Sequence, residues 1–405
     1  SMRALSASVV ALTILCARPA FGQTDTPDPV LAPAPTAAPA PRPITFDGRY
    51  VLDLIGVAAG GEARQSGVLD NLELTADADL ARLVGWHGAK ARVHLLSNQG
   101  RAINDAAGTL QGIDNIEVAD GRVKLYEAWI EQAFAGGRAA LLVGLADLNA
   151  DFYQNDGAAI LMAPAFGVGS ELAATGPNGP SIFPSTALMA RLNVTIGTSG
   201  YARAAVVNAR AGVLGDQYGV DLTMHDGALL IAEAGSTRGG KLAVGVWRYT
   251  RRQDDIRVVD VDGNPVHRAA MGAYLLVDQH IAGGDAHALS LFLRAGLSEG
   301  KTTPFRGGFQ IGAHIRGVVP GRPEGRLSFG LAHGLLSSGY RANVADTGER
   351  AASAENGIEI TYQDRLAPFL TIQPDLQYIR RACTEGGDRD TLVLGLRMIA
   401  TFGRH

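Results

Sequence analysis

The chain has 405 residues and a formal net charge of −4, with 46% hydrophobic residues, 19% charged residues and 51 glycines. Its basic residues are almost all Arg and form no Lys/Arg-rich block, which argues against nucleic-acid binding. No segment after the N-terminus approaches the roughly 20 uninterrupted apolar residues of a transmembrane helix. This mixture fits a transmembrane β-barrel, because the strands of a barrel are apolar on one face only.

The N-terminal segment predicts a secretory signal peptide over residues 1–22. Arg3 supplies the positive charge, an apolar run follows over residues 4–17, and Ala20 and Gly22 are small residues suited to cleavage. Cys16 lies within this segment, so Cys383 has no disulfide partner in the processed chain.

Residues 23–45 form a Pro/Ala-rich segment that cannot build a core and is predicted to be a periplasmic tether. The barrel is expected to occupy residues 46–405.

Alternation of apolar and polar residues dominates from residue 46 onward and is typical of strands. Over residues 72–80, Leu and Ala alternate with polar residues that include Glu73 and Asp77. Over residues 287–297, Leu and Ala alternate with residues that include Arg294. Segments of about ten residues with this period have the length of a tilted membrane-spanning strand.

The connections alternate between short turns and longer loops, as in an outer-membrane barrel with periplasmic turns and outer loops. The sequence therefore predicts an all-β fold, a transmembrane antiparallel β-barrel of about 16 strands. The predicted strands are 47–58, 68–80, 88–97, 122–135, 138–146, 186–196, 201–209, 227–236, 241–250, 269–281, 286–298, 306–317, 325–336, 354–364, 367–379 and 390–402. A barrel of this size has a bore wide enough for an aqueous channel.

Charged residues on the polar faces are expected to point into the lumen, since they would be costly in lipid. The inward residues are Glu73, Asp77, Arg92, His94, Arg191, Asn193, Arg294, His314, Arg316 and Arg397. Two interpretations remain open for each of them: general solvation of a polar lumen, or selection of solutes. Arg offers planar donors to sugar hydroxyls. Trp129 and Trp247 could stack on a sugar ring, but equally could pack under a loop or in an interface belt.

The segment 147–185 is the longest connection, and loops of this length are usually functional. In a barrel it can fold inward and narrow the pore to an eyelet. The acceptors expected near the constriction are Asp147, Asn149, Asp151, Asn155 and Asp156. The first three resemble the start of a calcium loop, but Gly and Glu are missing from its sixth and twelfth positions, so no metal site is predicted.

An enzyme borne on a barrel is a further alternative, because some outer-membrane barrels are hydrolases. The nine His residues lie outside any GxSxG or HExxH motif, so isolated surface His is favoured over a catalytic set. No glycine-rich phosphate loop precedes a helix. The sequence predicts no enzymatic activity and no cofactor.

Several stretches resemble the carbohydrate-selective porins of the OprB type. They are LDNLELTADADL (69–80), LYEAWIEQ (125–132), GLADLNADFY (144–153), FGVGSEL (166–172), GPNGPSIFPSTALMARL (176–192), PFLTIQPDLQYI (368–379) and LVLGLRM (392–398). The resemblance implies a sixteen-stranded outer-membrane barrel that passes monosaccharides and similar sugars by facilitated diffusion. It also implies that loops and charged residues narrow the channel. Within matching stretches this points to Glu127, Trp129, Asp147, Asn149, Asp151 and Arg191.

The expected partners are small sugars, outer-membrane lipid and the barrel-assembly machinery, with a periplasmic partner for the tether left open. Monomer and homotrimer also remain open. Outer-membrane barrels usually end on an aromatic residue, whereas here Phe402 is followed by three more residues. A general pore or a polysaccharide-export pore remains the alternative to a sugar-selective one.

Overall fold

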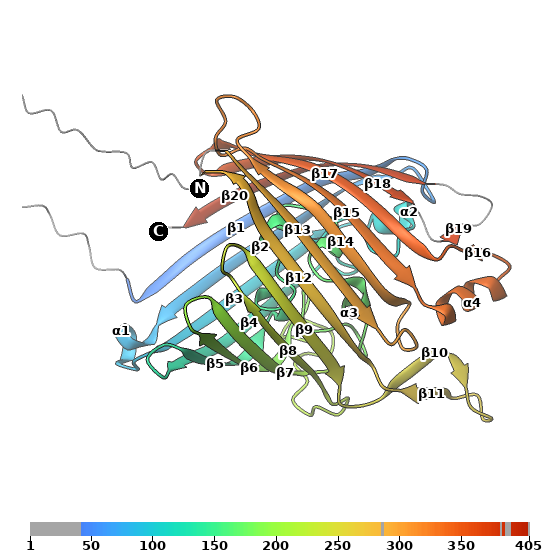
Figure 1. Cartoon of the computed structure of the whole chain (residues 1–405), viewed down its shortest axis with the longest axis horizontal. Coiled ribbons are helices and arrows are strands. Elements are labelled where there is room, and N and C mark those ends of the chain that lie inside the picture. The colour runs from blue at the N-terminus through green and yellow to red at the C-terminus, as the bar shows by residue number, and fades with distance from the viewer. Residues whose placement is uncertain (1–41, 285–286, 381–382, 385–389, 404–405) are drawn as a thin grey trace, which may run out of the picture. The chain divides into compact units, whose positions relative to one another are not determined.

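The computed structural model describes residues 42–284, 287–380, 383–384 and 390–403. Sixteen antiparallel strands form a closed barrel in which each strand pairs with its neighbours in chain order. The ring closes where β1 pairs with β20, over a register that runs from Asp47 opposite Gly403 to Ala59 opposite Leu392. Figure 1 shows this meeting of the blue and red ends of the described chain. Closure leaves no free strand edge, which satisfies the backbone in a membrane.

The barrel strands are β1 (Ile44–Ala59), β2 (Ser66–Asp79), β3 (Ala89–Gly100), β4 (Val123–Phe134), β5 (Ala139–Ala146), β6 (Ala187–Ile196), β7 (Gly200–Asn208), β8 (Ala228–Ser236), β9 (Lys241–Tyr249), β12 (Met271–Gly283), β13 (Ala288–Ser298), β14 (Phe305–Arg316), β15 (Arg326–Leu336), β17 (Ala354–Ala367), β18 (Leu370–Arg380) and β20 (Thr391–Gly403). Four short strands lie outside the ring as two pairs: β10 (Gln253–Val259) with β11 (Pro265–Arg268), and β16 (Arg350–Ala351) with β19 (Cys383–Thr384).

The helices are all short: α1 (Leu80–Val84), α2 (Asn104–Ala107), α3 (Ser170–Ala173) and α4 (Ser338–Asp346), with 3-10 turns η1 (Leu148–Ala150), η2 (Asp156–Ala158) and η3 (Pro164–Phe166). Among the described residues, no helix has the length and apolar character needed to cross a membrane. The helices sit in the turns and loops, where they shape the connections between strands.

The predicted all-β barrel and its sixteen strands are confirmed. One turn was misplaced: residues 365–366 belong to β17, and the chain turns at Pro368 and Phe369. Proline lacks an N–H and has the φ that turns favour, so the turn forms there. The β10–β11 hairpin was predicted as a plain loop. β1 begins at Ile44, inside the predicted tether. The predicted signal peptide and most of the tether (1–41) lie outside the described residues.

The two faces of the strands differ as the alternation predicts. The outward face carries exposed apolar side chains, such as Leu54, Leu74, Val143, Val206, Leu291, Ile360 and Leu394. Exposed aromatic residues gather near the ends of strands that meet at the short turns: Phe46, Trp86, Phe134, Phe369 and Phe402. Aromatic girdles of this kind mark the interface between lipid and water.

The barrel interior is packed rather than empty. The β3–β4 loop (residues 101–122) and the β5–β6 loop (residues 147–186) fold inside, and Figure 1 shows α3 of the second loop among the strands. Ile103 and Ile113 of the first loop pack in one buried cluster with Val51 of β1 and Val393 of β20. The second loop contributes Phe152 to another cluster, with Met189, Leu229 and Trp247. Hydrophobic burial inside the ring therefore holds the two loops against the wall.

Candidate functional site

The β5–β6 loop is held by wall side chains that bond to its backbone. Arg294 of β13 is 1% exposed and donates to the carbonyls of Tyr153 at 3.1 Å, Gly167 at 2.7 Å and Ala165. A guanidinium has five donors in a fixed fork, so a single side chain can fix several carbonyls of a curved loop. Gln310 accepts from its Nε at 2.8 Å, which orients the fork.

Carboxylates and amides on other strands hold the same loop from other sides. Glu359 of β17 accepts from the amides of Met162 and, at 2.9 Å, Ala163. Asp278 of β12 accepts from the Gly157 amide at 3.0 Å. These strands belong to different parts of the ring, so the loop crosses the lumen and is anchored on several walls.

The β3–β4 loop is attached in the same manner. Glu355 of β17 accepts from the amides of Leu110 at 2.8 Å and Gln111 at 2.9 Å. Gln377 of β18 donates to the Ile113 carbonyl at 2.8 Å. Buried backbone groups of this loop are thus satisfied by the wall, which an irregular segment at this depth requires.

Arg397 of β20 joins this loop to β1. Its guanidinium forms a bidentate ion pair with Asp53, in which Nη2 lies 2.6 Å from Oδ2, and the same Nη2 lies 3.3 Å from Asp114 Oδ1. Asn115 accepts from the same guanidinium at 2.8 Å. One cation is therefore shared by two carboxyl groups, and burial raises the pKa of Asp114 well above its ordinary value, which favours the neutral form of this group.

A cavity of about 330 Å³ lies between the two inserted loops and defines the candidate eyelet. Its polar lining includes Asp114, Glu117, Asp147 and Asn149, and Phe183 adds an aromatic face. Such a cavity offers both hydrogen-bond acceptors and an apolar surface, a combination that fits polyhydroxylated solutes.

Asp147 begins the β5–β6 loop and sits at the eyelet. Tyr126 of β4 donates to Oδ2 at 2.7 Å, and the Asn149 amide donates to Oδ1 at 2.7 Å, which caps η1. Burial raises the pKa of Asp147 to about 6, although both hydrogen bonds oppose this shift. The charge of this carboxyl group therefore changes near pH 6.

A larger cavity, of about 1140 Å³, forms a vestibule beside the eyelet. Ala173, Ile182, Phe183 and Pro184 line both cavities, so the two adjoin. The β7–β8 loop (residues 209–227) supplies one side of the vestibule and carries Tyr218, which is 85% exposed.

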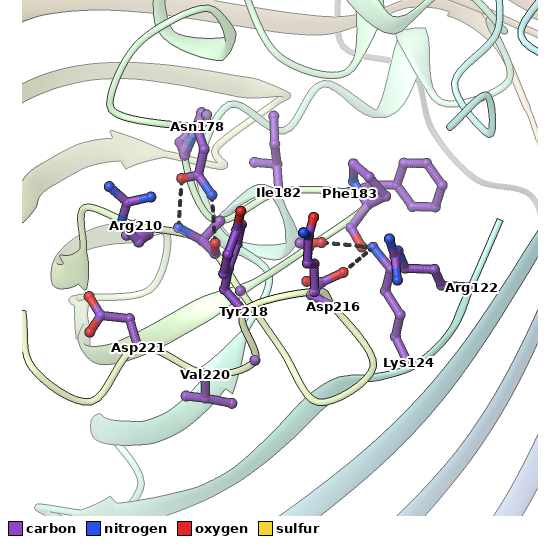
Figure 2. A pocket seen from close by; sticks show the side chains of 18 of the residues that line it. Arg122, Lys124, Asn178, Ile182, Phe183, Arg210, Asp216, Tyr218, Val220 and Asp221 are labelled. Carbon is purple, nitrogen blue, oxygen red and sulfur yellow. Dashed lines mark hydrogen bonds and ion pairs between the residues drawn. The ribbon is translucent and has the colours of Figure 1, made fainter. Parts of the chain in front are cut away.

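The vestibule loop is held in place by polar contacts that Figure 2 shows. Lys124 of β4 pairs with Asp216 at 2.7 Å and donates to the Ser185 hydroxyl at 2.8 Å. The Asn178 side chain bonds both the amide and the carbonyl of Ala211, at 3.0 and 2.7 Å. Hydrogen bonds, those from Lys124 and Ser185 first, outweigh burial and lower the pKa of Asp216, so it stays charged.

One wall of the lumen carries a cluster in which basic side chains contact acidic ones. Arg92 of β3 bonds Asp77 at 2.7 Å and lies 5.5 Å from the ring centre of half-buried Trp129. Glu127 accepts from Trp129 at 3.3 Å and lies 3.2 Å from His94. Arg92, Trp129 and Glu127 therefore form one cluster.

A second wall cluster forms around Arg191 of β6. Its guanidinium pairs with Glu131 at 2.9 Å and with Asp151 at 2.8 Å. Asp151 also lies 3.6 Å from Arg203. Asn193 follows on the same inward face and is half-buried. Asp151 thus anchors the β5–β6 loop to the wall instead of lining the eyelet.

The structure sorts the predicted residues into three groups. Asp147 and Asn149 line the eyelet. The paired wall clusters contain Arg92, Glu127, Trp129, Asp151 and Arg191, with Asn193 close by on β6. Arg294 and Arg397 are buried behind the loops, so their prediction as solute contacts is corrected: both position loops. Trp247 is 2% exposed and offers no stacking face.

Sequence reasoning missed the β3–β4 loop, which contributes Asp114 and Glu117 to the eyelet. The sequence of the β3–β4 connection contained an indication that this loop is buried. It is more than twenty residues long and contains Ile103, Ile113 and Ile116 between polar residues. Apolar residues spaced along so long a loop indicate that it packs against something.

Comparison with known proteins now identifies the family. A family model described as "Carbohydrate-selective porin, OprB family" matches residues 63–402, which is most of the chain. The chain belongs to the OprB family of carbohydrate-selective porins. This membership supports an outer-membrane sugar porin, as the resemblance implied, and a channel rather than an enzyme.

Individual relatives match the chain at low sequence identity. The putative porin QuiX of Acinetobacter baylyi is 21% identical over 386 residues, covering 84% of this chain and 85% of QuiX. The high-pH structure of Pseudomonas putida OprB matches with a TM-score of 0.78 at 22% identity, covering 89% of this chain and 94% of that one. The trimer form of Vibrio cholerae OmpT matches at 0.51 and 10% identity, covering 89% and 99%.

Proposed function

We propose that this OprB-family porin conducts small neutral sugars, such as monosaccharides, by facilitated diffusion through the vestibule and the eyelet. The observation that carries the proposal is the eyelet itself. Two loops anchored on several walls enclose a cavity that pairs carboxylate and amide groups with the aromatic face of Phe183. A sugar ring presents hydroxyl groups at its edge and C–H groups on its faces, so both surfaces can be used.

The two cavities suggest an order of contacts along the path. Tyr218 is exposed in the vestibule, and Phe183 lies where the vestibule meets the eyelet. Asp147 and Asn149 follow in the eyelet. Aromatic faces alternating with hydrogen-bonding groups let a sugar exchange contacts as it moves, without any one site holding it tightly. Weak, successive binding is what conduction requires.

Liposome swelling tests this function. Refolded protein is placed in liposomes, and the entry of glucose is compared with that of an uncharged non-sugar solute of matched size. Glucose is expected to enter faster. Equal entry would indicate a general pore, and entry of neither by a folded barrel would favour an export channel or a barrel-borne hydrolase.

A variant links the function to the eyelet. Phe183→Leu keeps the apolar bulk but removes the aromatic face, so glucose entry is expected to slow relative to the matched solute. Aromatic contacts of this kind contribute about 0.5–1.5 kcal/mol, which predicts a reduction of roughly two- to ten-fold. Phe134→Leu, on the outward face, is the matched control. Equal slowing of both solutes would remove Phe183 from the sugar path.

The same proposal covers the processing, the cellular location and the assembly of the barrel. Residues 1–22 would be removed on export, residues 23–45 would lie in the periplasm, where a partner could bind them, and lipid would surround the outward face. The barrel-assembly machinery would read the last strand, in which Phe402 is the final aromatic residue. A homotrimer is the assembly to test, because OmpT, which shares the fold, has a trimer form.

A further inference from the structure

The eyelet and the wall of the lumen balance their charges differently. On the wall, Arg92 and Arg191 each pair with at least one carboxylate. The eyelet cavity, within the described parts of the chain, is lined by the carboxyl groups of Asp114, Glu117 and Asp147 and by no Lys, Arg or His. A solute therefore meets compensated charge along the wall. At the constriction, Glu117 and Asp147 have no basic partner among the described residues, whereas Asp114 shares Arg397 with Asp53.

The eyelet carboxyl groups owe their contacts mainly to neutral donors. Glu117 accepts from the backbone amides of Ile103 at 3.0 Å and Asn104 at 3.1 Å. Asp147 accepts from the Tyr126 hydroxyl and the Asn149 amide. Among the described residues, neither Glu117 nor Asp147 forms an ion pair with a basic side chain. Amide and hydroxyl donors stabilise a carboxylate but leave its net charge in place.

Asp114 adds an independent indication that this cavity accepts donors. Its side chain is buried, with 3% of its surface exposed, and it lines the eyelet. Oδ1 accepts from the Ile116 amide at 2.9 Å and lies near Arg397, whereas Oδ2 has no hydrogen-bond partner. A buried oxygen without a donor is costly, so a passing donor group would be favoured beside it.

We infer that the eyelet discriminates by charge among sugars: protonated amino sugars pass more readily than neutral sugars, and sugar acids pass least. The inference rests on the proposed sugar-conducting function and adds the class of sugar that the constriction favours. The physical reason is that a cation gains, and an anion loses, Coulomb energy beside Glu117 and Asp147 in a narrow space between low-dielectric walls. Neutral sugars use the same oxygens only as hydrogen-bond acceptors.

The test measures the entry of glucosamine, glucose and gluconate into liposomes at pH 7, where Asp147, with a pKa of about 6, is mostly charged and the amine of glucosamine is still mostly protonated. Reversal potentials in a potassium chloride gradient give the preference between cation and anion independently. The expected order is glucosamine, glucose, gluconate, together with a preference for potassium. Gluconate entry equal to or faster than that of glucosamine would overturn the inference.

The variants are Glu117→Gln with Asp147→Asn, which keep the shape and the hydrogen-bonding capacity while removing two charges. We expect the ratio of glucosamine to gluconate entry to fall by at least about five-fold, equivalent to about 1 kcal/mol, the energy of one pair of unit charges about 4 Å apart in water. The single variant Asp147→Asn serves if the double variant fails to fold. An unchanged ratio in a folded variant would overturn the inference.

Asp262→Asn with Glu324→Gln is the matched control, because both side chains are exposed and neither lines the eyelet or the vestibule. This control should leave the ratio unchanged, and a fall as large as that of the eyelet variant would show a general surface-charge effect and overturn the inference. Failure of the inference is distinguishable from failure of the proposed function. If glucose enters faster than its matched solute but charge has no effect, only the inference fails.

Discussion

At the scale of single residues, the partner of each charged side chain decides what it can do. Arg191 pairs with Glu131 and Asp151, and Arg203 also lies 3.6 Å from Asp151, so two cations balance two carboxylates on this wall. Asp147 has only neutral donors within hydrogen-bond distance, so its charge is available to a solute. Sequence alternation places both inside the barrel without distinguishing these roles.

Asp147 predicts a pH dependence of ion selectivity. Because burial raises its pKa to about 6, the carboxyl group is neutral below this pH and charged above it. The groups that face it are Tyr126, Asn149 and, from neighbouring strands, Glu127 and His94. Cation preference should therefore weaken as the pH falls through about 6, by up to about five-fold for one unit charge.

Reversal potentials measured across this pH range provide the check. Asp147→Asn should lose the step near pH 6 and show the weaker preference at every pH. His94→Gln is the companion variant, because His94 lies 3.2 Å from Glu127, which faces Asp147. A step that persists in Asp147→Asn and disappears in His94→Gln would assign the transition to the histidine.

At the scale of elements, the inserted loops are irregular segments that side chains of the β-strands hold in place. The strands present side chains whose polar groups replace the partners that a loop backbone would find in water. Arg294 is an example, because its side chain takes no part in the backbone pairing of its own strand. Its guanidinium donates to three carbonyls of the β5–β6 loop. The width of the eyelet is therefore set by side chains that do not line it.

Replacing Arg294 should widen the eyelet. Arg294→Met removes the donors of three carbonyls, each bond to a charged group being worth about 1.5–3 kcal/mol, so the loop should loosen while the barrel stays folded. Single-channel conductance should rise, and the current should become noisier. Arg294→Lys, which keeps the charge but not the fork, should give an intermediate effect.

Arg82→Met is the matched control, because Arg82 belongs to α1 in a turn outside the eyelet. It should leave conductance unchanged. Unaltered conductance in Arg294→Met, with the barrel folded as judged by heat-dependent mobility in gels, would show that hydrophobic packing alone holds the loop.

At the scale of the whole molecule, one closed ring separates two environments. Each strand exposes apolar side chains outward and polar or loop-contacting side chains inward, so successive residues face lipid and the lumen in turn. Leu396 and Arg397 on β20 are consecutive, yet the first is 36% exposed on the outer face and the second is 5% exposed inside. The barrel is therefore most sensitive to charge on its outward face.

Leu396→Arg should destabilise the barrel by about 2–4 kcal/mol, because it places a charge in lipid near the middle of a spanning strand. Ala58→Arg, near the end of β1, should cost only about 0–1 kcal/mol. Denaturant unfolding from lipid vesicles measures both values. Equal costs at the two positions would mean that position 396 does not face the centre of the membrane.

The sequence by itself determined the barrel, its sixteen strands and the direction of most side chains. Period-two alternation is local, and a one-residue shift would expose every charge to lipid, so the pattern leaves little freedom. The family was also recognisable from the sequence, because its stretches extend from residue 69 to residue 398. Asp147 and Asn149, which line the cavity between the loops, were singled out from one long polar loop, and their role as solute acceptors stays a prediction.

Only the tertiary structure decided which loops enter the lumen and which charges remain uncompensated there. Asp114 and Arg397 are 283 residues apart yet 3.3 Å from each other, and nothing local in the sequence pairs them. The burial of Arg294 likewise depends on a loop that begins more than a hundred residues earlier. Pore width and charge are set by contacts that exist only once the ring has closed around its loops.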